Sequence, residues 1–189
     1  ELTPEEQMLL DKEYDAFVRS GALLDEAGKE KLRKLTEEAS MLTLQFSQNL
    51  LKENKAFILH LTDKAQLSGL PDTAIDAAAQ AAKERNLDGW VITLDYPSYS
   101  PFLIYSDHRD LRKQLYMARN TECTHDNDSN NIDICKRLIN IRQAMAQLLG
   151  YDTFADYMLK HRMASNVANV YKLLNDLINA YKPTAINEL

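Results

Sequence analysis

The four histidines are the side chains of this sequence best suited to bind a metal ion or to transfer a proton: His60, His108, His125 and His161. A helical zinc site needs two histidines one turn apart, as in His-Glu-x-x-His, so that both imidazoles reach one ion and the Glu activates the bound water. No two of the histidines lie within a helical turn, and the His-Glu-x-x-His motif does not occur in the 189 residues. We therefore predict no catalytic or structural zinc site in this chain, although a site assembled from distant residues stays open.

A second group of possible ligands lies close together in the sequence: Cys123, His125, Asp126 and Cys135. These residues lack the paired short spacing of zinc modules. A cysteine nucleophile also needs a base and an orienting group arranged in space, which the two-residue separation of Cys123 and His125 does not demonstrate. We expect both cysteines to fill small apolar spaces, and two cysteines are too few for a disulfide framework, which indicates a reducing compartment.

Asp126, Asp128 and Asn130 match the first three ligand positions of a calcium-binding helix–loop–helix. The match then fails, because Asn131 stands where the loop requires Gly and Arg137 where it requires a bidentate Glu. We therefore predict that these polar side chains cap the helix that begins near Asn131.

Two further clusters have both a functional and a structural interpretation. An aromatic cluster could line a peptide groove, but packing between helices and strands is favoured because aromatic rings bury large areas; it contains Trp90, Tyr96, Tyr99, Phe102 and Tyr105. A basic run is expected to form a solvated helix face; it contains Arg109, Arg112, Lys113 and Arg119. The chain has no glycine-rich phosphate loop and no Gly-x-Ser-x-Gly elbow.

The composition bounds the class of protein. The chain is 45% hydrophobic and 26% charged, with only five Gly and five Pro, which favours a helical fold of one domain or one lobe. The net charge of −6 argues against a nucleic-acid partner. No apolar run approaches the ~20 residues that cross a bilayer, and no secretory signal is visible, so we expect no membrane partner and a cytoplasmic location. The chain begins with Glu and its periodic pattern runs to the last residue, so we expect both ends to have been cut from a longer protein.

The first 54 residues predict two helices. Thr3, Pro4 and Glu6 form a capping box at the start of the first, and Gly21 ends it. A longer helix runs from about residue 25 to residue 54, with a seam on one face that consists of Leu32, Leu35, Ala39, Leu42, Phe46 and Asn49. We predict that the two helices pack as an antiparallel hairpin, since the seam has too few heptads for an intermolecular coiled coil.

The middle of the chain predicts a mixed segment. Residues 57–61 and 90–94 are short apolar runs of strand length that can pair as a ribbon, with a helix over 70–85 between them. Residues 95–101 predict a turn before a short apolar helix that ends near Tyr105, and a further helix covers 107–119. Residues 121–131 are polar and predict a loop.

The last third predicts helices over 132–149 and 153–163, separated by Gly150-Tyr151. Ser165 is expected to cap a final helix, which Pro183 kinks or ends. Its predicted buried side consists of Val167, Val170, Leu173, Leu174, Leu177, Ile178 and Tyr181. The predicted fold is mostly α, an antiparallel helical hairpin and multi-helix assembly with a minor β-ribbon. Residues 1–189 form one helical lobe or fragment, with sub-parts 1–54, 55–120 and 131–189.

Several strings in the helix–Gly150–helix unit carry a family resemblance: Ile141-Arg142, Ala146, Leu148-Leu149-Gly150-Tyr151, Ala155-Asp156-Tyr157 and Met163-Ala164. Weaker strings precede them in the same order over 19–23, 67–71 and 90–99. In that order the residues resemble the thimet oligopeptidase and peptidyl-dipeptidase family of zinc metallopeptidases, and bacterial peptidyl-dipeptidases most of all.

The resemblance implies a chain of several hundred residues that folds as two helical lobes around a narrow channel for short peptides. It places the zinc and its His-Glu-x-x-His later in the sequence, so that this fragment is channel wall and scaffold, inactive alone. We accordingly assign no catalytic, cofactor-binding or metal-binding residue. The implied partners are the remainder of its own polypeptide and, in the parent enzyme, short peptides, from which C-terminal dipeptides are released. The alternative is a non-enzymatic helical interaction module that uses the seam from Leu32 to Asn49.

Overall fold

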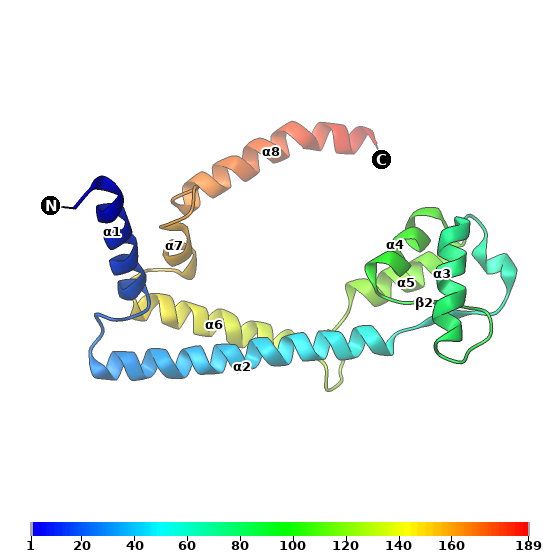
Figure 1. The fold of residues 1–189 in the computed structure, drawn as a ribbon. Helices are drawn as coiled ribbons and strands as arrows, with labels where there is room; N and C mark the ends of the chain where they lie inside the picture. The colour runs from blue at the N-terminus through cyan, green and yellow to red at the C-terminus, as the bar shows by residue number, and fades with distance from the viewer. Residues whose placement is uncertain (1, 189) are drawn as a thin grey trace. The chain divides into compact units, whose positions relative to one another are not determined.

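A computed structural model of the chain describes residues 2–188 (Figure 1). Within them the chain forms eight α-helices, one short 3-10 helix and a two-stranded sheet, so the prediction of a mostly α fold with a minor β-ribbon is confirmed. The chain divides into two compact units. Unit 1 contains the residues up to Met41 and those from Lys136 onward, and unit 2 contains Leu42–Cys135. None of the helices in residues 2–188 combines the length and the apolar character that a membrane crossing requires.

Unit 2 is built on the predicted ribbon. Strand β1 (Leu59–Leu61) pairs antiparallel with β2 (Trp90–Ile92), and Leu59 lies opposite Ile92. A short 3-10 helix (Lys64–Leu67) follows β1, and Asp63 caps it as its side chain accepts the Ala65 N–H.

Helices α3 (Asp72–Lys83) and α4 (Tyr96–Tyr105) pack against β2, and α5 (Arg109–Asn120) packs against α4. The turn predicted over 95–101 is wrong, because α4 already begins at Tyr96. Pro97 stands in its first turn, where the missing N–H costs nothing, and Pro101 lies inside the helix. The unit 2 core consists of Leu59, Leu61, Leu67, Leu70, Ala78, Ile92, Leu94, Phe102 and Leu115.

Unit 1 begins with α1 (Pro4–Arg19), and the predicted capping box is present. The Thr3 hydroxyl accepts the Glu6 N–H at 3.3 Å, while the Glu6 carboxylate accepts the Thr3 N–H at 2.8 Å. Gly21 follows the helix with φ +91°, as the predicted glycine stop requires.

Helix α2 (Glu26–Ala56) and helix α6 (Ile132–Leu148) each begin in one unit and end in the other. In unit 1, Glu38 of α2 pairs with Arg137 of α6. Helix α1 contacts α7 through the Tyr157 hydroxyl, which donates to the Arg19 carbonyl, and His161 after α7 lies beside Asp15. The antiparallel packing of the first two helices over residues 1–54 stays a prediction. Leu32 of the predicted seam is buried, and the rest of the seam is half-buried.

The last two helices are α7 (Phe154–Leu159) and α8 (Val167–Asn187). Asn166 caps α8, and Ser165, the predicted cap, instead adopts φ +62°. Pro183 lies inside α8 and does not end it. The predicted buried side of α8 is wrong, because Val167 and Val170 are half-buried and the others are exposed: Leu173, Leu174, Leu177, Ile178 and Tyr181.

Candidate functional site

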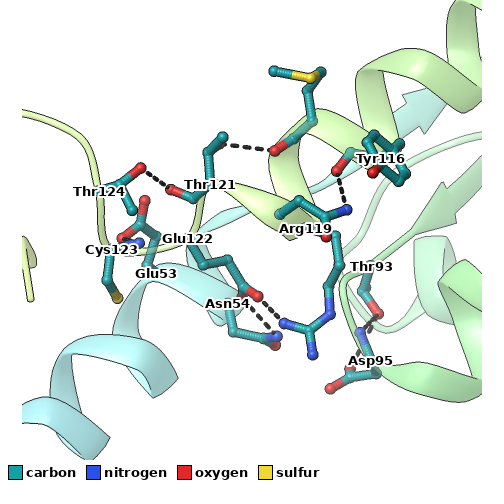
Figure 2. A network of polar contacts seen from close by, with 12 residues as sticks. Glu53, Asn54, Thr93, Asp95, Tyr116, Arg119, Thr121, Glu122, Cys123 and Thr124 are labelled. Atoms are coloured by element: carbon teal, nitrogen blue, oxygen red, sulfur yellow. Dashed lines mark hydrogen bonds and ion pairs between the residues drawn. The ribbon is translucent and has the colours of Figure 1, made fainter. Parts of the chain in front are cut away.

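The residues in unit 2 with the densest polar contacts lie where the 121–131 loop meets the end of α2 (Figure 2). We call these contacts the loop network. On α2, the Glu53 carboxylate accepts the backbone N–H of Cys123 at 2.6 Å, although the two residues are 70 positions apart. The Glu53 side chain is only 16% exposed, so water competes poorly for this charge-assisted hydrogen bond.

Glu122 extends the loop network toward α5. One of its carboxylate oxygens accepts a hydrogen bond from the Asn54 amide at 3.1 Å, and the other pairs with the Arg119 guanidinium. The carbon of that guanidinium lies 5.4 Å from the centroid of the Tyr99 ring. The Glu122 side chain is 5% exposed and the Arg119 side chain 38%, so the carboxylate of this ion pair is buried and its guanidinium is partly in contact with water.

The predicted solvated basic face is therefore wrong at two positions. Arg119 pairs with Glu122, and Arg112 donates to the backbone carbonyl of Ser106. Their periodicity placed them correctly on a helix, but spacing alone gives no sign of a distant acceptor. Arg109 and Lys113 are exposed, as predicted.

Asn131 joins the loop to α2 at a second place. Its side-chain oxygen accepts from the Asn49 amide at 2.9 Å, and its own amide donates to the Phe46 carbonyl at 3.1 Å. Its backbone N–H donates to the Cys123 carbonyl at 2.8 Å. Sequence reasoning missed this buried asparagine, and the signal that could have found it was Asn49, the one polar residue in an otherwise apolar seam.

The two cysteines have opposite environments. Cys123 is buried with φ +57°, and burial raises the pKa of its thiol to about 11, with a further contribution from the nearby Glu53 carboxylate. A neutral buried thiol is a poor nucleophile and a poor metal ligand, so Cys123 fits the predicted role of apolar filler. Cys135 does not, because it is exposed.

The histidines already have separate neighbours. The Nε2 atoms of His60 and His108 lie 2.6 and 2.8 Å from the carbonyls of Asp88 and Ala65. His161 Nε2 lies 2.9 Å from the Asp15 carboxylate. The Nε2 atom of His125 lies 3.6 Å from the Glu53 carboxylate and 3.3 Å from the Thr121 hydroxyl.

No group of three or more His, Cys, Asp or Glu side chains converges to hold a metal ion in the part of the chain that the structure describes. Zinc needs three or four such ligands around one point, and the donor groups of residues 2–188 do not provide that arrangement. The expected lack of zinc ligands over the whole chain stays a prediction. In the loop, Asn130 accepts the N–H of Ile132, the first residue of α6, at 2.8 Å, as expected for one of the three predicted capping residues. A capping role for Asp126 and Asp128 stays a prediction.

The aromatic cluster divides between core and surface. Phe102 is buried, and Trp90 and Tyr99 are half-buried against it, which confirms the packing interpretation for these three. Tyr96 and Tyr105 are exposed, and Tyr105 lines a groove of about 550 Å³ with prolines from α4 and from the residue before α3.

The loop network can fasten the 121–131 loop to α2 and α5, but it presents no activated nucleophile and no general base aimed at open space. Each carboxylate oxygen of Glu122, and the Glu53 oxygen that holds Cys123, already accepts a hydrogen bond inside unit 2 (Figure 2). An arrangement of this kind stabilises the fold and holds neighbouring elements in place.

Comparison with known proteins identifies the family. Residues 102–189 match Peptidase family M3. Over 189 residues the chain is 34% identical to dipeptidyl carboxypeptidase of Escherichia coli (strain K12). The matched residues are 100% of this chain and 28% of that protein. The chain is 30% identical over 192 residues to oligopeptidase A of the same organism, with the same two shares. Saccharolysin of Saccharomyces cerevisiae is 31% identical over 182 residues, which are 95% of this chain and 24% of that protein.

These relatives confirm the resemblance seen in the sequence, and they match this chain over nearly all of its length. The chain spans about a quarter of the length of each of them. The chain belongs to peptidase family M3.

Proposed function

We propose that residues 1–189 are a non-catalytic part, channel wall and scaffold, of a zinc-dependent peptidase that cleaves short oligopeptides. The observation that carries this proposal is the asymmetry of the comparisons. The similarity covers all of this chain, whereas it covers only 28% of dipeptidyl carboxypeptidase and 28% of oligopeptidase A. The zinc ligands and the catalytic groups of the parent protein would then come from polypeptide other than these residues.

The chemistry of the loop network supports a scaffold role. Its carboxylates are committed to Cys123, Asn54 and Arg119, and the buried thiol stays neutral because its pKa is raised. None of these groups is arranged for acid–base or nucleophilic work on a substrate. We assign no step of peptide hydrolysis to them.

Exposed apolar side chains in unit 1 support contact with further polypeptide. Several large apolar residues of α8 are between 42% and 68% exposed, and their positions recur at helical spacing: Leu173, Leu174, Leu177, Ile178 and Tyr181. Contiguous apolar surface of this kind is typical of an interface. We propose that the remainder of the parent polypeptide covers this face of α8.

The names of the relatives bear on which peptide bonds the parent enzyme cleaves. The identity to dipeptidyl carboxypeptidase of E. coli is 34%, against 30% for oligopeptidase A of the same organism. This difference supports a parent enzyme that releases C-terminal dipeptides from short peptides. A fluorogenic series with free and amidated C-termini tests the parent, because an exopeptidase of this type requires the free carboxylate and an endopeptidase does not.

The alternative of an interaction module built on the α2 seam has less support. Leu32 is buried inside unit 1, and inside unit 2 Asn49 donates to Asn131. A seam whose residues already have partners in their own units is not free to form a coiled coil between chains. Sedimentation of the isolated chain and of a Leu35→Glu variant tests this point: a wild-type oligomer that dissociates in the variant would favour the module.

The sequence of the natural gene and the zinc content of the chain test the proposal. We expect the reading frame to continue past Leu189 to a helix with His-Glu-x-x-His, and the purified 189-residue chain to hold no stoichiometric zinc after dialysis. A gene that ends at Leu189, or one zinc ion per chain that resists dialysis, would contradict it.

A further inference from the structure

A groove of about 1050 Å³ runs along α1 in unit 1. Its lining residues are mostly from α1, and the remaining one is His161 from the segment after α7. Apolar and aromatic side chains lie exposed beside charged ones, with Met8 59% and Tyr14 62% exposed. Such a surface fits a segment that presents apolar side chains together with a polar group.

The carboxylates of this groove already have partners. Asp11 accepts a hydrogen bond from the Gln7 amide at 2.8 Å, and Asp15 lies 2.9 Å from His161 Nε2. Lys12 is exposed, so water satisfies its ammonium group. The acidic groups of the groove are thus engaged within unit 1.

Arg19 differs from them. Its Nη1 atom is buried and has no hydrogen-bond partner among residues 2–188. The carbon of its guanidinium lies 4.2 Å from the centroid of the Tyr157 ring, which holds the cation over the aromatic face but satisfies no N–H donor. A buried guanidinium donor without an acceptor is costly, and native proteins rarely leave one unpaired.

We propose that Arg19 binds a carboxylate side chain carried by a segment of the parent polypeptide that lies in the α1 groove. This inference rests on the proposed function, because it takes the occupant from the rest of the same peptidase. Arg19 lines the groove and is half-buried as a residue, although its Nη1 atom is buried. The proposal therefore requires a rotation of the side chain that brings Nη1 to a carboxylate in the groove.

Charge complementarity selects this occupant. A guanidinium presents two parallel donors to the two oxygens of a carboxylate, which makes this pair stronger and more specific than neutral hydrogen bonds. The exposed Met8 and Tyr14 along the same groove call for apolar side chains on the same segment. The occupant is therefore an amphipathic segment with one Asp or Glu among apolar residues.

The test compares Arg19→Met and a control substitution, each made in the 189-residue chain and in the full-length parent. Arg19→Met keeps the apolar stem and removes the donors, and Arg162→Met removes an exposed arginine of the same unit that does not line the groove. Hydrogen exchange of the α1 amides is measured for both variants in the 189-residue chain and in the full-length parent. We expect Arg19→Met to speed exchange of α1 roughly ten- to a hundredfold in the parent, and to leave it nearly unchanged in the 189-residue chain. Arg162→Met should change neither.

The acceptor is then found by changing each Asp and Glu of the parent outside these residues to Asn or Gln. One of these variants should reproduce the effect of Arg19→Met, with no further effect in the double variant. Equal acceleration in both contexts would mean that Arg19 acts only within unit 1, and no acceleration in either would mean that it binds nothing; both results overturn the inference. These results leave the proposed function standing, whereas a gene that ends at Leu189 removes both.

Discussion

The Glu53 carboxylate on α2 accepts the backbone N–H of Cys123 at 2.6 Å and so fastens the 121–131 loop to a helix that lies 70 residues earlier in the chain. Glu122 and Asn54 make a second such link beside it (Figure 2). The loop is thus held by a few charge-assisted contacts to carboxylates that are largely buried, since it contributes few apolar side chains to the core.

Removal of the Glu53 carboxylate should destabilise unit 2. Glu53→Ala leaves the buried Cys123 N–H without an acceptor, which costs about 1–3 kcal/mol, and Glu53→Gln should cost less because its amide oxygen can still accept. Urea unfolding followed by the fluorescence of Trp90, the single tryptophan, reports on this unit. Glu37→Ala on the exposed part of α2 is the control and should change little. Equal effects of Glu53→Ala and Glu37→Ala would contradict the assigned role.

The raised pKa of the Cys123 thiol predicts unequal cysteine reactivity. Burial and the Glu53 carboxylate raise the pKa of the Cys123 thiol to about 11, so the thiol is neutral at pH 8. Cys135, in contrast, is exposed. At pH 8 a disulfide reagent should modify one cysteine per folded chain, and both in urea. Fast modification of Cys123 in the folded chain would show that the thiol is not protected.

The raised pKa of Cys123 also predicts that the free energy of unfolding falls as the pH rises. The folded-state pKa of Cys123 lies above the value for an unfolded chain, so the unfolded chain loses its proton first as the pH rises. The stability contribution of the neutral thiol is fully present below about pH 9 and is lost between about pH 9 and pH 11. In a Cys123→Ala variant, unfolding midpoints measured across this range should fall less steeply than in the wild type.

Gly69 should tolerate no side chain. Its φ is +86°, and a Cβ atom there would lie 2.1 Å from the backbone carbonyl oxygen of Tyr105. Gly150 has φ +83°, and a Cβ atom added to Gly150 would have no other atom within 4 Å. Gly150→Ala therefore measures the cost of backbone strain alone. We expect Gly150→Ala to cost about 1 kcal/mol and Gly69→Ala about 2–5 kcal/mol, because the backbone must also move. Circular dichroism melts compare the two variants, and equal losses would show that the close approach to Tyr105 is unimportant.

Glu38 should remain ionised at a lower pH than a free glutamate. The Arg137 guanidinium beside it lowers the pKa of this carboxyl in the folded chain. The stabilisation is therefore present above the ordinary glutamate pKa and is lost as the pH falls through the folded-state value. An NMR titration of the Glu38 side chain should show this lowered pKa, and Arg137→Gln should return it to the ordinary range. An unshifted Glu38 in the wild type would mean that solvent screens the pair completely.

Local signals predicted most of the secondary structure. Thr3, Pro4 and Glu6 marked the start of α1, and Gly21 and Gly150 marked helix ends, because each signal acts within a few residues of the backbone that it stabilises. The error at α4 has the same origin: prolines and serines typical of turns also suit the first turn of a helix, which is where Pro97 lies.

Contacts between distant segments were less predictable. The pattern of α8 showed that one face is apolar, but a pattern cannot show what covers that face, and Leu177 and Ile178 are exposed in unit 1. The pairs Asn49–Asn131 and Glu122–Arg119 depend on how helices pack, which the sequence does not reveal. The family assignment survived these errors because it came from residue strings in order rather than from packing.

A peptide-cleavage assay shows whether these 189 residues can catalyse hydrolysis without the rest of the parent polypeptide. The 189-residue chain and the full-length parent are each incubated with zinc and short fluorogenic peptides, with and without a chelator. We expect chelator-sensitive turnover by the parent and none by the 189-residue chain. Chelator-sensitive turnover by the 189-residue chain at a rate close to that of the parent would show that these residues hold a complete catalytic site.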